Sequence, residues 1–161
     1  MSKVLVDGTN SEVIVPKLAI IMRGLPGSGK SYWAEQFIIS QGIDQAIHIR
    51  QHGYFSTDRY FYYQGEYRFN PQKIAQYHQA NLTAFIQALA RSEPIVICDN
   101  TNIAKWEFMA YEAAAKALGY KVNVVLVGQP KDEPHQQLCA QRNQHHVPLV
   151  QIQKMAQLFE E

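Results

Sequence analysis

Residues 24–31 place the strongest constraint on how this chain of 161 residues can fold. They read Gly-Leu-Pro-Gly-Ser-Gly-Lys-Ser, which matches the pattern G-x-x-x-x-G-K-[ST] in full. Glycines at these positions let the backbone wrap around a phosphate group with several N–H groups pointing inward. Chance would produce this pattern in roughly 1% or less of chains of this length, given average glycine usage. The segment therefore predicts a phosphate-binding loop.

The sequence on both sides of this loop has the context that the pattern requires. Residues 18–22 form a short, continuous apolar run that ends at Arg23, which is typical of a buried parallel strand. A helix should follow the loop, and its N-terminus would present a partial positive charge to the same anion. Its apolar positions are Tyr32, Trp33, Phe37 and Ile38.

Strands and helices alternate along the rest of the chain. Further strands are expected at residues 54–56, 95–98 and 122–127. Helices are expected from Asn70-Pro71 to Leu89, over residues 106–118, and from about Glu133 and Pro148 onward. This alternation predicts an α/β P-loop NTPase fold, a parallel sheet of four to five strands covered by helices on both sides.

Length and composition predict one main domain. Residues 17–161 are expected to form a single domain around the loop, because a domain averages about 150 residues. Residues 1–16 read either as a partly ordered tail or as a short hairpin around a glycine turn. The content of 47% hydrophobic and 18% charged residues is typical of a globular chain.

Charge and cysteine content exclude several classes of protein. Lys and Arg total 15 against 14 Asp and Glu, and this net charge of +1 argues against binding dominated by a phosphate backbone. The two cysteines are too few for a disulfide scaffold. The N-terminus has no apolar leader, and no apolar run reaches the ~18 residues of a membrane span. We expect a soluble cytoplasmic protein with no membrane partner; its oligomeric state is left open.

The loop predicts a nucleoside triphosphate as ligand, and two side chains in it carry chemistry. Lys30 can reach the β- and γ-phosphates as a mobile point charge. The Ser31 hydroxyl suits Mg²⁺, which prefers oxygen ligands and keeps several waters. The ligand-binding residues expected in the loop are Gly24, Leu25, Pro26, Gly27, Ser28, Gly29, Lys30 and Ser31.

Two acidic residues follow predicted strands, at the sheet edge where ligands bind in doubly wound folds. Asp58, in Ser56-Thr57-Asp58, is placed to accept a proton from an attacking hydroxyl, or else caps a loop. Asp99, in Asp99-Asn100-Thr101-Asn102, can hold Mg²⁺ through water, or else caps the following helix.

Arg142 lies in a polar run, residues 141–148, that ends at Pro148 and suggests a lid between two helices. An arginine there could close over a transferring phosphate and offset its charge. The alternative is a solvated surface arginine.

These motifs together resemble one branch of the P-loop kinases. Residues 24–31, Ser56-Thr57-Asp58-x-Tyr60-Phe61, residues 99–102 and Arg142-Asn143-x-His145 recur there in this order. The chain resembles the kinase domains of polynucleotide 5′-kinases. It looks closer still to the polynucleotide-kinase-like P-loop module of certain ubiquitin-ligase-binding proteins, often described as an AAA-type ATPase domain. Features shared with that module are Trp106-Glu107, His78 with Asn81, and residues 147–149.

The resemblance implies ATP and Mg²⁺ as ligands, with Lys30 as a catalytic residue on the phosphates and Ser31 on the metal. It also implies Asp58 as general base and Arg142 as a lid arginine. Thr101 is then expected near the acceptor's phosphate. His78 is a candidate substrate contact, or else a satisfied buried histidine.

The chain departs from the phage-type polynucleotide kinase at two positions. Phe61 and His146 stand where that enzyme has arginines, and Arg59, beside Asp58, is the candidate substitute on the substrate side. The segment over residues 54–69 is rich in aromatic side chains, which either stack nucleobases or pack among themselves.

Three functions are therefore open. The first is transfer of the ATP γ-phosphate to a hydroxyl of a nucleic acid 5′ end or a nucleotide. The second is a small-metabolite or sugar-nucleotide kinase. The third is a non-kinase ATP-binding module that regulates a partner.

Overall fold

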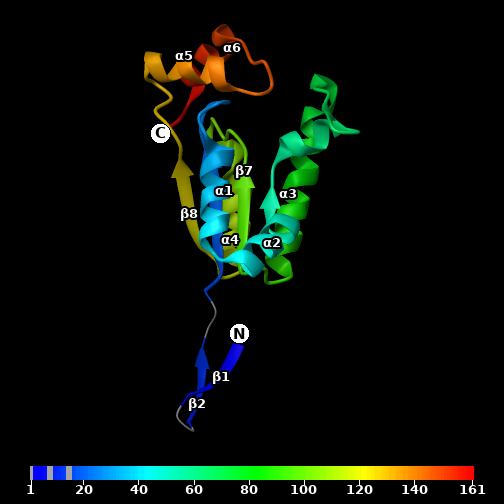
Figure 1. Cartoon of the computed structure of the whole chain (residues 1–161), viewed down its shortest axis with the longest axis vertical. Helices are drawn as coiled ribbons and strands as arrows, with labels where there is room; N and C mark the ends of the chain where they lie inside the picture. The colour runs from blue at the N-terminus through cyan, green and yellow to red at the C-terminus, as the bar shows by residue number, and fades with distance from the viewer. Residues whose placement is uncertain (1, 7–8, 14–15) are drawn as a thin grey trace.

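A parallel four-stranded sheet forms the centre of the molecule (Figure 1), in the order β4-β7-β3-β8. The computed structural model describes residues 2–6, 9–13 and 16–161 of the chain. The four strands are β3 (Leu18–Arg23), β4 (Tyr54–Phe55), β7 (Ile95–Asp99) and β8 (Lys121–Leu126). The predicted α/β fold with a parallel sheet is confirmed.

Helices cover the two faces of this sheet in pairs. The first face is covered by α1 (Lys30–Ser40) and α2 (Ile43–His52), and the second by α3 (Ile74–Ala90) and α4 (Met109–Ala117). Because successive side chains of a strand point to opposite faces, Ile20 packs with Ile38 and Ile49 under the first pair. Its neighbour Ile21 packs with Phe85 under the second pair.

Two helices lie across the carboxyl ends of the strands (Figure 1), namely α5 (Glu133–Arg142) and α6 (Leu149–Leu158). Asp132 caps α5, since its side chain accepts a hydrogen bond from the His135 N–H at 2.9 Å. The two helices share a small core with Leu25 of the glycine-rich loop. Its other buried members are Ile103, Cys139, Ile152, Ala156 and Phe159. This core attaches the predicted lid to the phosphate-binding loop.

Short elements complete the described fold. The 3₁₀ turns are η1 (Thr57–Phe61), η2 (Pro71–Lys73) and η3 (Lys105–Glu107). A hairpin of β5 (Tyr62–Tyr63) and β6 (Glu66–Tyr67) connects η1 to the segment before α3. At the N-terminus β1 (Ser2–Val6) pairs with β2 (Thr9–Val13) in antiparallel register. Of the hairpin predicted within residues 1–16, the glycine turn at residues 7–8 and the end of its second strand at residues 14–15 lie outside the described residues.

Several local expectations differ from the structure. Helix α2 and the hairpin β5–β6 were not predicted. Residues 106–118 were expected to form one helix, but Trp106 lies in the 3₁₀ turn η3 and α4 starts only at Met109. Both side chains are exposed, Trp106 by 75% and Met109 by 62%. Along the described residues, no helix combines the length and apolar character needed to cross a membrane.

Candidate active site

The glycine-rich loop ends where α1 begins, and its conformation leaves the helix N-terminus open. Gly29 precedes the helix at φ 103, a left-handed conformation that glycine adopts at little cost. Among the described residues no side chain caps this helix. Since the first N–H groups of a helix lack intrahelical partners, they are available to an anion. The buried Ser28 hydroxyl also finds no hydrogen-bond partner within the described part of the chain. These donors fit a phosphate group.

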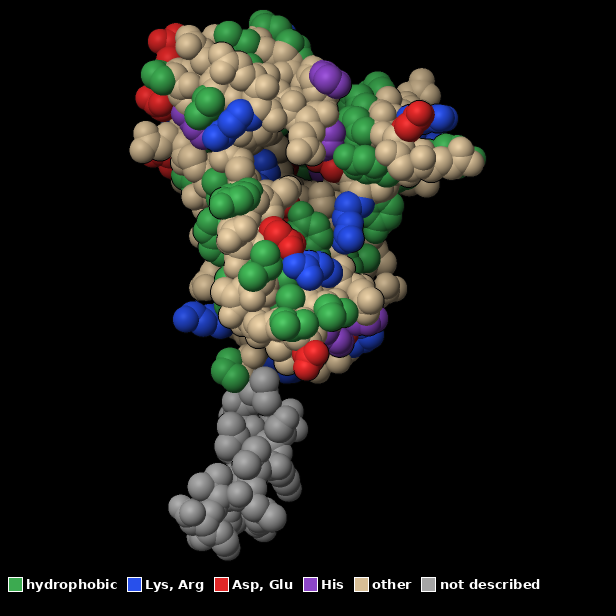
Figure 2. All heavy atoms as spheres, viewed as in Figure 1, with side chains coloured by type: hydrophobic (Ala, Val, Ile, Leu, Met, Phe, Trp, Pro, Cys, Tyr) green, Lys and Arg blue, Asp and Glu red, His purple; other side chains and the backbone are tan. Residues whose placement is uncertain are grey.

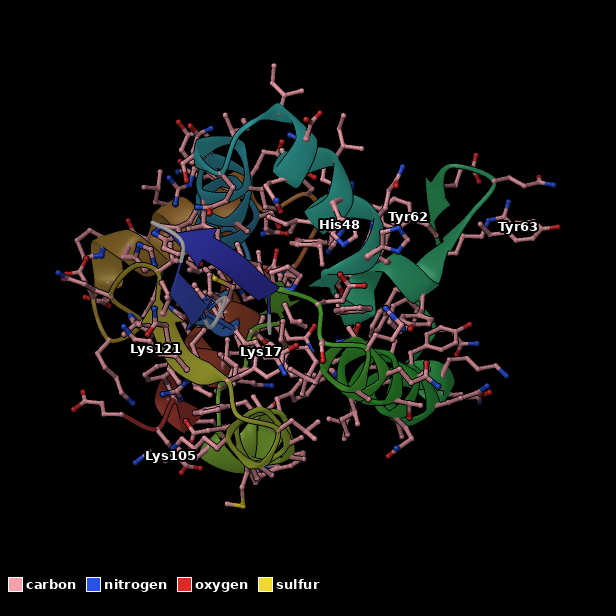
Figure 3. The ribbon with its side chains drawn as sticks, turned by 90° about the horizontal axis from the view of Figure 1, so that it is seen from below. Lys17, His48, Tyr62, Tyr63, Lys105 and Lys121 are labelled. Atoms are coloured by element: carbon pink, nitrogen blue, oxygen red, sulfur yellow. The ribbon has the colours of Figure 1, made fainter. Side chains whose placement is uncertain are left out.

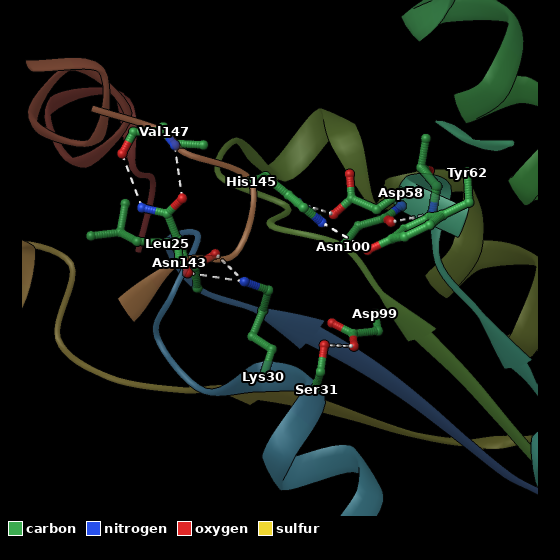
Figure 4. Close-up of polar contacts among 12 residues, drawn as sticks. Leu25, Lys30, Ser31, Asp58, Tyr62, Asp99, Asn100, Asn143, His145 and Val147 are labelled. Atoms are coloured by element: carbon green, nitrogen blue, oxygen red, sulfur yellow. Dashed lines mark hydrogen bonds and ion pairs between the residues drawn. The ribbon is translucent and has the colours of Figure 1, made fainter. Parts of the chain in front are cut away.

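Lys30 lies buried beneath this loop (Figure 4). Its Nζ donates to the backbone carbonyls of Gly24 and Leu25, both at 3.0 Å. Burial lowers the pKa of the Lys30 ammonium, and the negative charges of Asp99 and Asp58 act in the opposite direction. The ammonium group is therefore short of anionic partners in the protein itself, which fits a lysine that meets a triphosphate.

The two predicted metal-site residues lie together. Ser31 Oγ donates to Asp99 Oδ2 at 2.9 Å (Figure 4), and the Tyr54 hydroxyl donates to the same oxygen. Asp99 is buried at the end of β7. The burial of the Tyr54 phenol and the nearby negative charge of Asp99 both raise the pKa of that phenol. A hydroxyl and a carboxylate side by side fit Mg²⁺, which takes oxygen ligands and keeps several waters.

The end of β4 leads directly to Asp58, the predicted general base. Asp58 lies on η1, with its side chain 54% exposed. The preceding residue, Thr57, is held from two directions. Its N–H donates to Asn100 Oδ1 at 2.9 Å, and its hydroxyl lies 3.0 Å from His78 Nδ1. His78 is itself exposed, so the alternative of a buried histidine is wrong.

The remaining predicted site residues, Arg142, Arg59 and Thr101, each form hydrogen bonds with the backbone of another segment. Arg142, at the end of α5, donates from Nε and Nη2 to the Gly27 carbonyl at 3.2 and 2.9 Å. Arg59 donates to the Tyr54 carbonyl at 2.6 Å, and its guanidinium lies 5.1 Å from the centre of the Tyr54 ring. The backbone carbonyl of Thr101 accepts from the Gly24 N–H at 3.0 Å. The structure thus brings Arg142 and Thr101 to the phosphate-binding loop, and turns Arg59 toward β4.

Arg59 also lines a cavity of about 300 Å³ on the α1 and α2 side of the site. The other residues around it are Ser31, Glu35, Ile38, Arg50 and Tyr54. Arg50 is paired there with Glu35. The cavity is therefore continuous with the candidate metal site through Ser31.

Some aromatic side chains of residues 54–69 are buried and pack on other rings, and others are exposed. Phe61 is buried and packs on Tyr77, with ring centroids 4.8 Å apart. Tyr63, 58% exposed, lies at the outer end of the hairpin, while Tyr62 lies nearer the body of the molecule (Figure 3). Figure 2 shows a hollow between the lid helices and the hairpin side of the molecule, with charged side chains visible inside it.

Two residues important for the site geometry were given no role by the sequence. Buried Arg23 donates to the carbonyls of Asn102, Ile103 and Glu160 at 2.8, 2.9 and 2.6 Å. It thereby joins the start of the phosphate-binding loop to the end of the chain. Asn143 shapes the loop between α5 and α6 through several backbone hydrogen bonds. A charged residue ending an apolar strand was the available signal for Arg23.

Comparison with known proteins places the chain among P-loop domains. Residues 20–161 match a family described as an AAA domain. Human NEDD4-binding protein 2 is 31% identical over 145 residues, which cover 88% of this chain. The match spans only 8% of that protein's length.

Two solved structures share the fold. One is the Pnkp1/Rnl/Hen1 complex, with a TM-score of 0.55 and 18% identity, covering 76% of this chain and 39% of that one. The other is Kti12 of Chaetomium thermophilum in complex with ADP-AlF3, with a TM-score of 0.56 and 20% identity. That match covers 89% of this chain and 80% of Kti12.

Proposed function

The chain belongs to the AAA domain family, and from this premise we propose that it is an ATP-dependent kinase that phosphorylates a hydroxyl group. We take a nucleic acid 5′ end or a nucleotide as the acceptor. The family match over residues 20–161 shows an AAA-type P-loop domain. The acceptor and the catalytic roles below are proposals.

One observation carries the proposal: the Asp58 carboxylate follows β4 at the sheet edge where the phosphate-binding loop follows β3 and Asp99 ends β7. A module that only binds nucleotide needs no base there. Asp58 is exposed, on a turn that Asn100 and His78 hold through Thr57. An exposed carboxylate at that position suits proton removal from an incoming hydroxyl.

The acceptor oxygen bonds to the γ-phosphorus of ATP while the bond from that phosphorus to the bridging oxygen breaks. ADP leaves with the electron pair of that bond, and the hydroxyl proton goes to the Asp58 carboxylate. Lys30 and the N–H groups at the start of α1 bind the phosphates. Mg²⁺, held by Ser31 and through water by Asp99, would neutralise charge on the phosphate oxygens.

The other residues have roles around the transferring group. Arg142 already contacts the Gly27 carbonyl of the phosphate-binding loop, and we assign its guanidinium the role of offsetting charge on the phosphates. Thr101 and His78 flank the acceptor side. Arg59 is proposed as a contact to an acceptor phosphate, which it would reach from its present position on Tyr54.

Asp58→Asn tests the proposal, because asparagine keeps shape and polarity but cannot take the proton. We expect turnover to fall by about 10²–10⁴ while ATP affinity stays within a few-fold. Transfer is measured with radiolabelled ATP and a panel of acceptors: 5′-hydroxyl DNA and RNA oligomers, nucleosides and sugars. Asp44→Asn, an exposed aspartate at the start of α2, is the matched control.

Each outcome selects one function. Unchanged transfer by Asp58→Asn would remove Asp58 from the mechanism. Transfer only to small sugars or metabolites would favour the second kind of kinase. ATP binding without transfer to any acceptor would favour a regulatory module.

A further inference from the structure

The loop between α5 and α6 touches the acceptor side of the site through His145. The imidazole stacks on the Tyr67 ring, with centroids 3.8 Å apart and an angle of 9° between the planes. Its Nε2 lies 3.5 Å from the Tyr62 hydroxyl, and its Nδ1 lies 3.6 Å from Asp58 Oδ2 (Figure 4). One ring therefore contacts η1, β5 and β6 at once.

The loop that carries His145 is closely held at its base. Asn143 donates from Nδ2 to the carbonyls of Cys139, Ala140 and Val147, at 3.1, 3.1 and 2.9 Å. The Asn143 Oδ1 accepts from the Val147 N–H at 2.7 Å, which closes the loop on itself. Inside this closed loop His146 adopts a left-handed φ of 57. These contacts fix the direction in which His145 leaves the lid.

The hairpin surface that His145 contacts is also held in place by neighbouring residues. Tyr67 packs on buried Phe61 and on Phe69, with ring centroids 6.0 and 6.5 Å apart. The Arg68 N–H donates to the Phe61 carbonyl at 2.8 Å, which ties β6 back to η1. The contact between the lid and the hairpin thus joins two ordered elements.

We propose that His145 is a positioning residue, which aligns the Asp58 carboxylate when the lid lies against the hairpin. This inference rests on the proposed kinase function. Asp58 is 54% exposed, so packing alone leaves its side chain free to rotate. A general base must lie within about 2.6–3.2 Å of the proton that it takes, and such contacts tighten when substrate binds. At 3.6 Å the contact of His145 Nδ1 with Asp58 Oδ2 is longer than a hydrogen bond, and a closer approach of the lid would shorten it to one while leaving the other oxygen for the acceptor.

The same lid also carries Arg142, which contacts the phosphate-binding loop at Gly27. Arg142 contacts the phosphate-binding loop, and His145 contacts Asp58. Lid closure would therefore organise both partners of the transfer in one movement.

Three variants test this role. His145→Phe keeps a ring to stack on Tyr67 but has no nitrogen for Asp58. His145→Gln restores an N–H donor without the ring. Gln144→Ala is the control, because Gln144 is an exposed residue on the same loop, directly before His145. The readouts are ATP affinity by calorimetry, and kcat and KM for the acceptor that the wild type uses.

We expect His145→Phe to lower kcat by about 10–100-fold with unchanged ATP affinity and acceptor KM, since misplacing a reacting group by about 1 Å costs up to 10²-fold. His145→Gln should recover part of this loss, and Gln144→Ala should match the wild type. A wild-type kcat in His145→Phe, or an equal loss in Gln144→Ala, would overturn the positioning role alone. A wild type that phosphorylates no acceptor would overturn the proposed function and this role together.

Discussion

The surroundings of Lys30 in the folded protein disfavour the charged form of its side chain. The ammonium group is buried, and burial lowers its pKa, which means that the folded protein disfavours its charged form. Two backbone carbonyls are its hydrogen-bond partners. A triphosphate would supply the negative charge that these carbonyls lack, so ligand binding should stabilise the protein through this side chain.

The first residue-scale prediction follows from that argument. With ATP and Mg²⁺ at about 100 times Kd, binding stabilises by about 2.7 kcal/mol. For a domain of this size that corresponds to a rise in Tm of about 5–10 °C. Lys30→Met should fold but lose this rise. Lys121→Met, at the exposed start of β8, should keep it. Thermal unfolding with and without nucleotide measures both, and a wild-type rise in Lys30→Met would contradict the assignment of the loop.

Side-chain positions were predictable only where a motif specifies them. The pattern at residues 24–31 and the carboxylate after the third predicted strand were enough to place Ser31 beside Asp99, as observed. Arg23 was missed because the carbonyls that it binds, including that of Glu160, lie far away in the sequence. Arg59 follows Asp58 in the chain, yet its direction is set by Tyr54, which no local pattern indicates.

At the scale of elements, the critical contact joins the phosphate-binding loop to α5. Gly27 has a left-handed φ of 81, and a Cβ there would lie 2.4 Å from the Cys139 carbonyl and 2.9 Å from the Asn143 nitrogen. The last turn of α5 therefore approaches the loop at a distance that only glycine allows. This close contact explains how Arg142 reaches the Gly27 carbonyl.

Gly27→Ala tests the contact, and the chain offers a matched control. Gly65, in the hairpin, also has a φ of 81, but a Cβ there meets nothing within 4 Å. Gly65→Ala should cost only the strain of the left-handed backbone, about 1–2 kcal/mol. Gly27→Ala carries that strain and a backbone clash as well, so we expect a further loss of about 1–3 kcal/mol and weaker ATP binding. Chemical unfolding measures the loss in the free energy of unfolding for both variants. Equal losses would show that α5 moves away from the added methyl group without destabilising the protein.

Elements were predicted well where burial imposes a pattern. The apolar runs of β3 and β7 are buried between two helical layers, so they were recognisable as strands. Helix α2 was missed because Ile43 and Ile47 are exposed while Ala46 and Ile49 are buried, which blurs the helical spacing of its apolar residues. The hairpin β5–β6 has strands of two residues each, too short for any alternation to be visible.

At the scale of the whole molecule, charge decides how a nucleic acid could bind. The net charge is +1. Two arginines near the candidate acceptor side are already paired with carboxylates, Arg50 with Glu35 and Arg68 with Glu66. Arg59 and Arg142 each donate to a backbone carbonyl, so their charges remain available to phosphate. Two of these four arginines are therefore available to a nucleic acid backbone.

The last prediction follows from this charge distribution. Each phosphate of a single strand that a protein neutralises adds about −0.7 to the slope of log K against log[salt]. With one to three acceptor phosphates bound, we expect a shallow slope, no steeper than about −2 to −3. Binding of a 5′-hydroxyl single-stranded oligomer across a salt series measures it. A slope near about −6 would require an extended basic groove and would contradict this expectation. Absence of binding at every salt concentration would instead favour a small-metabolite acceptor, because such a substrate needs no contact beyond the site around Asp58.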